Sequence, residues 1–214
     1  VAIGDVDGDG DLDLLIGNSG NSKANELWLN DGTGAFSAAD GFLEGSANTY
    51  AVAIGDIDGD GDLDLLAGNY NGANELLLMD GDGAGAFSAA DGFPGGSAST
   101  RAVAIGDIDG DGDLDLLAGN DGANELLLND GTGAFSAADG FPGGSAATRA
   151  VAIGDVDGDG DLDLLIGNYY GEPNELLLND GTGAFSAADG FPGGSAETYA
   201  VAIGDVDGDG DLDL

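Results

Sequence analysis

Five copies of one acidic segment, D-[VI]-D-G-D-G-D-L-D, recur along the chain and place carboxylates at alternate positions. In the first copy, Asp5, Asp7, Asp9 and Asp13 occupy positions 1, 3, 5 and 9. Ca²⁺ is a hard cation that takes about six to eight oxygen ligands, which alternating carboxylates on a short loop can supply. By analogy with the EF-hand loop, the main-chain carbonyl of Asp11 is the expected ligand at position 7. Each segment is therefore predicted to bind one calcium ion.

The five loops together are predicted to bind up to five Ca²⁺. The last loop lies at the edge of the sequence, so its occupancy is the least certain of the five. All five Asp of each loop are candidate metal ligands, and these are Asp5, Asp7, Asp9, Asp11 and Asp13; Asp56, Asp58, Asp60, Asp62 and Asp64; Asp107, Asp109, Asp111, Asp113 and Asp115; Asp155, Asp157, Asp159, Asp161 and Asp163; and Asp205, Asp207, Asp209, Asp211 and Asp213.

Other interpretations of the acidic loop agree less well with the sequence. An EF-hand would place Glu at position 12, where this chain has Ile16, and would have flanking helices. The chain has no His and no Cys, which are the usual ligands of zinc, copper and iron sites. A merely solvated acidic turn has no need of five mutually repelling Asp within nine residues. Calcium remains the expected cofactor.

The acidic loops belong to a repeat that organises the whole chain. The segment V-A-I-G-D begins at five places 48 to 51 residues apart, which are Val1, Val52, Val103, Val151 and Val201. A period near 50 with short apolar segments and Gly turns favours propeller blades over helical solenoids. We therefore expect one repeat domain, residues 1–214, with repeats at 1–51, 52–102, 103–150 and 151–200 and the start of a fifth at 201–214.

Each repeat is predicted to form four strands. In the first repeat these are residues 2–6, 12–17, 26–30 and 34–38, so the acidic loop joins the first two strands. The second and third strands are almost continuously apolar, which predicts burial on both faces. The expected fold is all-β, with four-stranded antiparallel blades repeated about every 50 residues. The blades would form a β-propeller-like closed ring, or an open or superhelical array.

Two Phe in each of the four repeats are expected to fill the space between blades. They recur at equivalent places, so core packing is their simplest role. These residues are Phe36 and Phe42, Phe87 and Phe93, Phe135 and Phe141, and Phe185 and Phe191.

The loop of residues 5–13, preceded by V-A-I-G and followed by L-L-I-G-N, resembles the calcium loop of FG-GAP and VCBS-type repeats. That family includes the blades of the integrin α-subunit propeller and many bacterial surface proteins. The resemblance extends over the whole chain and implies four-stranded blades with a Ca²⁺ loop between the first two strands. The family's Gly-Ala-Pro element is replaced here by G-F-P-G-G at residues 92–96 and by G-F-L-E-G at residues 41–45. The packing between blades is therefore expected to differ from that of integrins.

Charge narrows the range of partners. The chain has 42 acidic and 3 basic residues and a formal net charge of −39, so nucleic acid and acidic membrane surfaces are not expected to bind it. No apolar run is long enough for a membrane helix. The first residue is Val1, and no signal segment follows it, which suggests a mature product or an excerpt of a longer array.

Three functional classes were weighed. An acid–base hydrolase is disfavoured because calcium accounts for the clustered Asp and because catalytic sites break repeat symmetry, so no enzyme is expected. The favoured function is an extracellular or cell-surface calcium-binding structural or adhesion protein. The alternative is a segment of an extracellular filament built from head-to-tail repeats.

Candidate partners are therefore a second copy of the chain or a protein or carbohydrate ligand at the variable loops. Tyr70, Tyr169 and Tyr170 lie in loops of differing length between the second and third strands, where they could stack on a sugar or a protein. They could equally be ordinary exposed loop residues.

Overall fold

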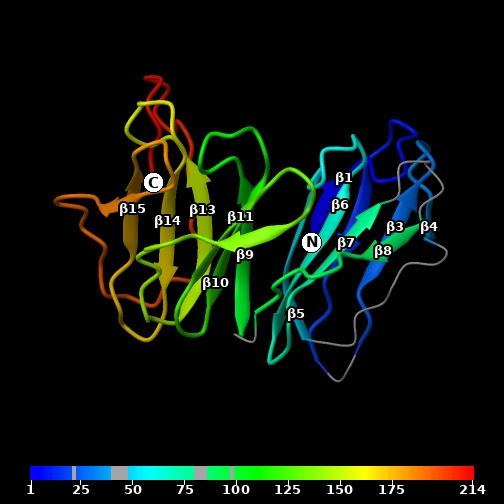
Figure 1. The fold of residues 1–214 in the computed structure, drawn as a ribbon, viewed down its shortest axis with the longest axis horizontal. Coiled ribbons are helices and arrows are strands. Elements are labelled where there is room, and N and C mark those ends of the chain that lie inside the picture. Colours follow the sequence, from blue (N-terminus) through cyan, green and yellow to red (C-terminus); the bar gives the residue numbers. More distant parts are fainter. Residues whose placement is uncertain (21–22, 40–47, 80–85, 97–98) are drawn as a thin grey trace. The chain divides into compact units, whose positions relative to one another are not determined.

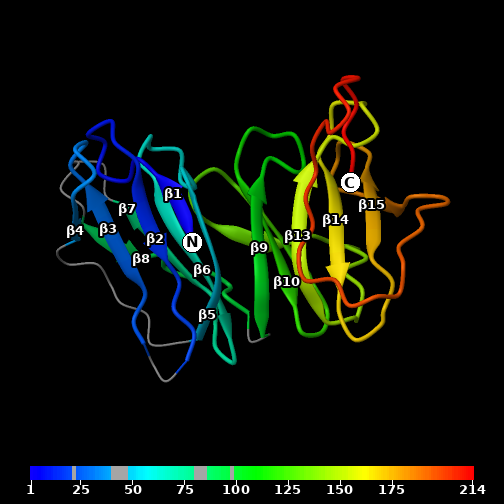
Figure 2. The ribbon, with the colours of Figure 1, turned by 180° about the vertical axis from the view of Figure 1, so that it is seen from behind.

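The computed structural model describes residues 1–20, 23–39, 48–79, 86–96 and 99–214, which form sixteen β-strands in four antiparallel sheets (Figures 1 and 2). Each sheet has four strands in chain order. The predicted all-β fold, with four-stranded blades about every 50 residues, is confirmed. Among the described residues, none forms a helix that is long and apolar enough to cross a membrane. The sheets consist of β1 (Ala2–Gly4), β2 (Asp13–Ile16), β3 (Glu26–Asn30) and β4 (Phe36–Ala38); β5 (Asn48–Gly55), β6 (Asp64–Tyr70), β7 (Glu75–Met79) and β8 (Phe87–Ala89); β9 (Thr100–Gly106), β10 (Asp115–Asn120), β11 (Glu125–Asn129) and β12 (Phe135–Ala137); and β13 (Thr148–Gly154), β14 (Asp163–Asn168), β15 (Glu175–Asn179) and β16 (Phe185–Ala187).

The strands of the first blade differ from the predicted ranges only at their ends. β3 has the predicted bounds, whereas β1 ends at Gly4 and β2 begins at Asp13. Between them the backbone leaves the sheet because its amides bond carboxylates, as when Val6 N donates to Asp13 Oδ2 over 2.8 Å. The acidic loop therefore includes residues 5, 6 and 12, which the apolar pattern alone assigned to the first two strands.

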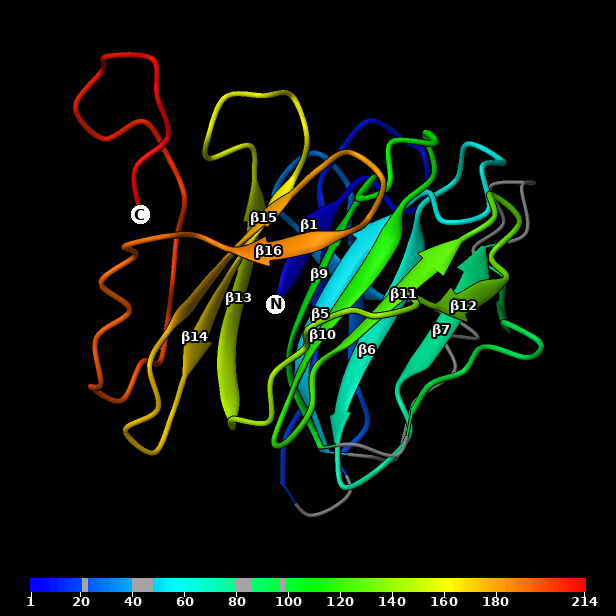
Figure 3. The same cartoon turned by 60° about the vertical axis from the view of Figure 1, so that its left-hand side comes forward.

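The chain divides into two compact units, residues 1–100 with 129–135 and residues 101–128 with 136–214. Figure 3 shows the strands β13 to β16 of the second unit. In the first unit β1 lies beside β5, and in the second β10 lies beside β13. Each unit has a hydrophobic cluster built from successive repeats. The first contains Val6, Leu15, Leu27, Leu65, Met79 and Phe87, and the second contains Ile108, Leu117, Leu126, Leu164, Ile166 and Leu177.

The second strand of the third and fourth blades is buried on both faces, as its continuous apolar sequence predicts. Every residue of β10 and β14 is buried. A glycine near the end of this strand lets the next blade approach closely. A Cβ atom at Gly119 would lie 2.8 Å from Thr148 Cγ2 and 3.0 Å from Val151 Cγ1, and Gly167 meets Thr198 and Val201 in the same way.

Phe side chains fill part of the space between blades. Phe93 and Phe135 meet edge to face with ring centroids 5.4 Å apart, and Phe141 and Phe185 meet likewise at 5.7 Å. Both pairs join residues of consecutive repeats, as the sequence predicts. Phe42 and the G-F-L-E-G segment at 41–45 lie outside the described residues.

A buried polar pair fixes the first two strands of a blade at the end remote from the acidic loop. The Thr148 hydroxyl donates to Asn168 Oδ1 over 2.9 Å, and Asn168 Nδ2 donates to the carbonyl of Pro173 over 2.7 Å. Thr49 and Asn69 form the same pair over 2.7 Å. Thr148 and Asn168 are both buried, so each polar group depends on this partner.

We expect Thr148→Val to destabilise the folded chain by about 1–3 kcal/mol, because the variant keeps the side-chain shape but leaves Asn168 Oδ1 buried without its donor. Urea unfolding at saturating calcium would measure the loss. Thr182→Val is the matched control, since Thr182 Oγ1 also donates to a side-chain oxygen, that of Asp180, but in an exposed turn. Equal losses in the two variants would contradict this account of the buried pair.

Candidate metal centres

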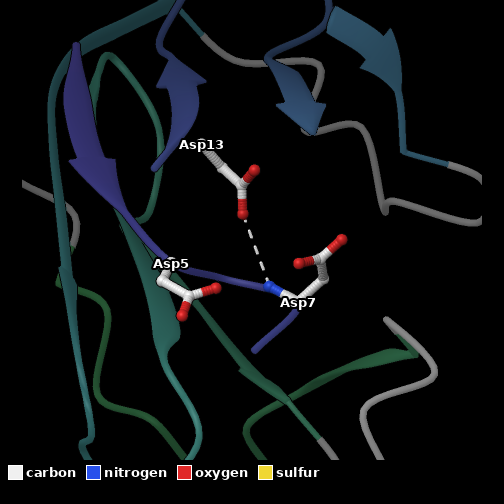
Figure 4. Close-up of side chains that lie close together, drawn as sticks. All are labelled: Asp5, Asp7 and Asp13. Carbon is white, nitrogen blue, oxygen red and sulfur yellow. Dashed lines mark hydrogen bonds between the residues drawn. The ribbon is translucent and has the colours of Figure 1, made fainter. Parts of the chain in front are cut away.

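Three carboxylates converge in each acidic loop. They occupy positions 1, 3 and 9, and in every loop one oxygen from each lies within 4.8 Å of the others. Figure 4 shows the first group, in which Asp5 follows β1, Asp7 lies in the loop and Asp13 begins β2. Three close carboxylates with no basic residue among them form an arrangement that could hold a cation. The groups are Asp5, Asp7 and Asp13; Asp56, Asp58 and Asp64; Asp107, Asp109 and Asp115; Asp155, Asp157 and Asp163; and Asp205, Asp207 and Asp213.

The position-9 carboxylate is also a structural joint. Asp64 is buried, and its Oδ2 accepts from Ile57 N over 2.7 Å while its Oδ1 accepts from Met79 N over 2.8 Å. These contacts tie the loop to β6 and β7. Burial raises the pKa of Asp64 to about 6, although the two backbone hydrogen bonds act in the opposite direction.

The position-1 carboxylate supplies the observation that fits a bound cation best. The Oδ1 atoms of Asp5, Asp56 and Asp107 are buried and accept no hydrogen bond. The other carboxylate oxygen is used by the loop itself, since Asp5 Oδ2 accepts from Gly10 N over 3.0 Å. A buried carboxylate oxygen without a donor is costly unless a cation compensates it. These three loops therefore fit a bound metal ion.

The carboxylates at positions 5 and 7 lie outside the close groups. Asp9 Oδ1 accepts from Asp11 N over 2.9 Å, and the Asp11 carboxylate lies against Gly32 in the turn between β3 and β4. Gly8 and Gly10, with φ of 73° and 96°, provide the tight wrap that the sequence predicts. The position-5 and position-7 carboxylates of the other loops, likewise outside the close groups, are Asp60, Asp62, Asp111, Asp113, Asp159, Asp161, Asp209 and Asp211.

The electrostatics of the loops disfavour negative charge at position 3. Burial, and then repulsion from Asp60, raise the pKa of Asp58, and burial and Asp111 do the same for Asp109. In contrast, hydrogen bonds from Thr182 lower the pKa of Asp180 in the turn after β15. The loops are therefore the places where a cation would relieve the charge repulsion.

The loops differ in how far they are covered. The position-3 carboxylate is partly buried in the first three loops, but Asp157 is exposed in the fourth. In the last loop Asp205, Asp207 and Asp213 are all exposed. A turn of the following repeat lies close to the second and third loops. A Cβ at Gly133 would lie 3.6 Å from Asp58 Cβ, and a Cβ at Gly183 would lie 3.5 Å from Asp109 Cβ.

The FG-GAP-like repeat is matched four times, over residues 5–67, 56–118, 107–166 and 155–214. The chain belongs to the FG-GAP-like repeat family. No curated protein matches the chain. Among solved structures, the chain is similar to an Agrocybe aegerita lectin that specifically recognises non-reducing terminal N-acetylglucosamine, with 23% identity and a TM-score of 0.55. The match covers 92% of this chain and 52% of the lectin, so the chain spans about half of the lectin's length.

A second polar cluster lies at the opposite end of the fourth FG-GAP blade. The Arg149 guanidinium lies over the Tyr169 ring, 4.3 Å from its centroid, and the Tyr169 and Tyr199 hydroxyls are 3.2 Å apart. Tyr170 is 68% exposed and has φ of 60°, which is uncommon for a residue other than glycine. Sequence reasoning singled out Tyr70, Tyr169 and Tyr170 as loop residues, but Tyr70 ends β6, and the contact of Tyr169 with Arg149 depends on strand pairing.

Sequence reasoning overlooked one residue that contacts the loops of two FG-GAP blades. Asn179 ends β15, and its Nδ2 donates to the carbonyl of Ile108 over 2.7 Å. Asn129 makes the same bond to Ile57 over 2.7 Å. The available signal was the N-D-G triplet that recurs at Asn30, Asn129 and Asn179.

We expect Asp58→Ala and Asp64→Ala each to reduce the number of bound calcium ions by one, as calorimetric titration would measure. In saturating calcium, Asp64→Ala should cost about 1–3 kcal/mol more stability, because it also leaves two backbone amides without their acceptor. Ser88→Ala, an exposed substitution on β8, is the control. Equal losses of stability in the two Asp variants would contradict a structural role of the position-9 carboxylate beyond calcium binding.

Proposed function

We propose that the chain is an extracellular calcium-binding module, in which Ca²⁺ held by the Asp loops stabilises FG-GAP blades. The buried, unpaired Oδ1 atoms of Asp5, Asp56 and Asp107 carry this proposal. Each belongs to a group of three carboxylates within 4.8 Å. The all-oxygen ligand set and the flexible loop suit Ca²⁺ better than Mg²⁺, which needs nearly ideal octahedral geometry and retains several waters.

The bound cation would supply positive charge where the ends of the first two strands meet. The chain's own residues then perform the structural work. Asp13 accepts from Val6 N in the loop and, over 2.8 Å, from Asn30 N at the end of β3. Ordering this carboxylate therefore orders three strands at once. Five Ca²⁺ would change the formal charge from −39 to −29, since −39 + 10 = −29.

An extracellular location follows from the expected affinity. Extracellular calcium modules bind with dissociation constants of roughly 10⁻⁴ to 10⁻³ M, far above the calcium concentration of resting cytosol. The large remaining negative charge favours solubility and opposes non-specific association. We therefore propose that calcium is a permanent structural component, and that the chain acts through binding and has no catalytic function.

Chelation of calcium is expected to unfold the blades. Excess EDTA should abolish the β-sheet circular dichroism spectrum, and excess Ca²⁺ should restore it, whereas the same concentration of Mg²⁺ should restore little. At free calcium a hundredfold above the dissociation constant, each occupied site adds about 2.7 kcal/mol of stability. A spectrum unchanged by EDTA would contradict the proposal.

The matched control for chelation removes the position-3 carboxylate from every loop. Because each group then keeps only two of its three converging carboxylates, this variant should bind Ca²⁺ weakly, and its circular dichroism spectrum should no longer respond to added Ca²⁺ or EDTA. A calcium response equal to that of the unaltered chain would locate the ions elsewhere. The five substitutions are Asp7→Asn, Asp58→Asn, Asp109→Asn, Asp157→Asn and Asp207→Asn.

A carbohydrate is the ligand class that the second surface favours. Tyr170 and Tyr199 are 68% and 64% exposed, and Arg149, which lies over the rings of Tyr169 and Tyr199, provides a hydrogen-bond donor group. Exposed aromatic rings next to polar groups suit the mixed apolar and hydroxyl faces of a sugar. One solved structure with a similar fold is a lectin that recognises non-reducing terminal N-acetylglucosamine. The filament alternative stays a prediction.

Glycan-array binding of the calcium-loaded chain tests this ligand class. We expect retention of glycans, among which those ending in N-acetylglucosamine are the first to examine, and at least a tenfold loss of binding in Tyr170→Ala/Tyr199→Ala, equivalent to about 1.4 kcal/mol. Tyr50→Ala is the control, because Tyr50 is also exposed but belongs to another blade. Absence of glycan binding, or equal binding by the double variant, would exclude this surface as a sugar site.

A further inference from the structure

Asn179 links the acidic loops of two consecutive repeats. Its side-chain Nδ2 donates to the carbonyl of Ile108 in the third loop over 2.7 Å. Its backbone amide donates to Asp163 Oδ1, at position 9 of the fourth loop, over 2.9 Å. Asn179 is buried, so both bonds are shielded from water.

The path continues to the metal group of the third loop. Ile108 is 1% exposed, and its amide donates to Asp115 Oδ2 over 2.8 Å. Ile108 therefore accepts from Asn179 at its carbonyl and donates to Asp115 through its own amide, so the two peptide groups that flank its Cα carry the path. A continuous buried path, Asp115–Ile108–Asn179–Asp163, joins two groups of converging carboxylates.

The turn that follows Asn179 packs against both loops. On one side, a Cβ at Gly183 would lie 3.5 Å from Asp109 Cβ in the third loop. On the other side, the Asp161 carboxylate of the fourth loop lies against Gly181. A change in the order of either loop therefore alters the packing surface of the other.

We propose that Asn179 is a positioning residue that couples calcium binding at the third and fourth loops, an inference that rests on the proposed function. Ca²⁺ at one loop fixes its position-9 carboxylate and, through it, the Ile108 peptide or the Asn179 amide. The neighbouring loop then has less conformational freedom left to lose when it binds its own ion. Binding at the two loops is thus positively cooperative, and the effect is reciprocal.

The residues equivalent to Asn179 in the second and third repeats allow a comparison within the chain. Asn129 repeats the side-chain bond of Asn179, to the carbonyl of Ile57 in the second loop. At the equivalent place in the second repeat stands Met79, whose amide still donates to Asp64 Oδ1. The Met79 thioether has no donor to offer the first loop. Among the residues that the structure describes, no such side-chain bond joins the first loop to the second.

Calorimetric titration of the full chain with Ca²⁺ tests the coupling when only the third and fourth loops are left able to bind. Every titration is done in enough sucrose to keep the metal-free chain folded, as its circular dichroism spectrum reports, so that calcium-driven folding does not itself make binding cooperative. Asp7→Ala, Asp58→Ala and Asp207→Ala together create this background. We expect two ions, a Hill coefficient above 1, and a second ion bound about fivefold or more tightly than the first. Adding Asn179→Met, the residue that the second repeat already accommodates, should bring the Hill coefficient to 1.

The reciprocal experiment keeps the first and second loops through Asp109→Ala, Asp157→Ala and Asp207→Ala. This background should bind two ions independently, and adding Met79→Asn should make their binding cooperative. A merely structural role of the asparagine would change stability without changing the Hill coefficient. The Met79→Asn gain also tests the coupling if Asn179→Met fails to fold.

Two independent sites in the first background, or unchanged cooperativity in its Asn179→Met form, would overturn the coupling and leave the proposed function intact. If Asn179→Met fails to fold, independent sites after Met79→Asn would overturn it instead. Absence of calcium binding in every variant would overturn the proposed function, and the coupling with it.

Discussion

Repulsion among carboxylates held within 4.8 Å of one another is the constraint on which the blades depend. The position-9 Asp cannot move away from the others, because backbone amides of the loop and of the third strand hold it, as Val6 and Asn30 hold Asp13. The interactions that fix the strands are therefore the same ones that concentrate negative charge. A cation at this place would convert the repulsion into attraction without any change of backbone path.

The sequence predicts the blade, its period and the position of the acidic loop, because strand pattern, glycine turns and repeats are all local signals. Strand ends were harder to predict. β1 stops at Gly4 because the amides beyond it turn to Asp13, a contact across the hairpin that apolar pattern does not report. Likewise, the spacing of the five Asp in a loop does not indicate which three carboxylates converge. Asp9 and Asp11 became distinct from the others only once the loop's own hydrogen bonds were known.

Contacts between repeats were the least predictable part. Asn179 and Ile108 are 71 residues apart, and their hydrogen bond follows from the stacking of blades. Arg149 and Tyr169 belong to one blade, and their contact follows instead from the pairing of its strands. The two ends of a blade thus differ in their interactions. Buried hydrogen bonds join the acidic loops at one end, while exposed aromatic side chains vary from repeat to repeat at the other.

The glycines near the ends of the second strands have a consequence for how such a chain can gain or lose repeats. Because Gly119 and Gly167 have no side chain, the next blade is seated by main chain and by a Thr and a Val common to several repeats. At these contacts, packing between blades does not require a large side chain that occurs in one blade alone. Blades that share the glycine and the Thr and Val can therefore follow one another in any order, and a repeat gained or lost by unequal recombination leaves a junction that still packs.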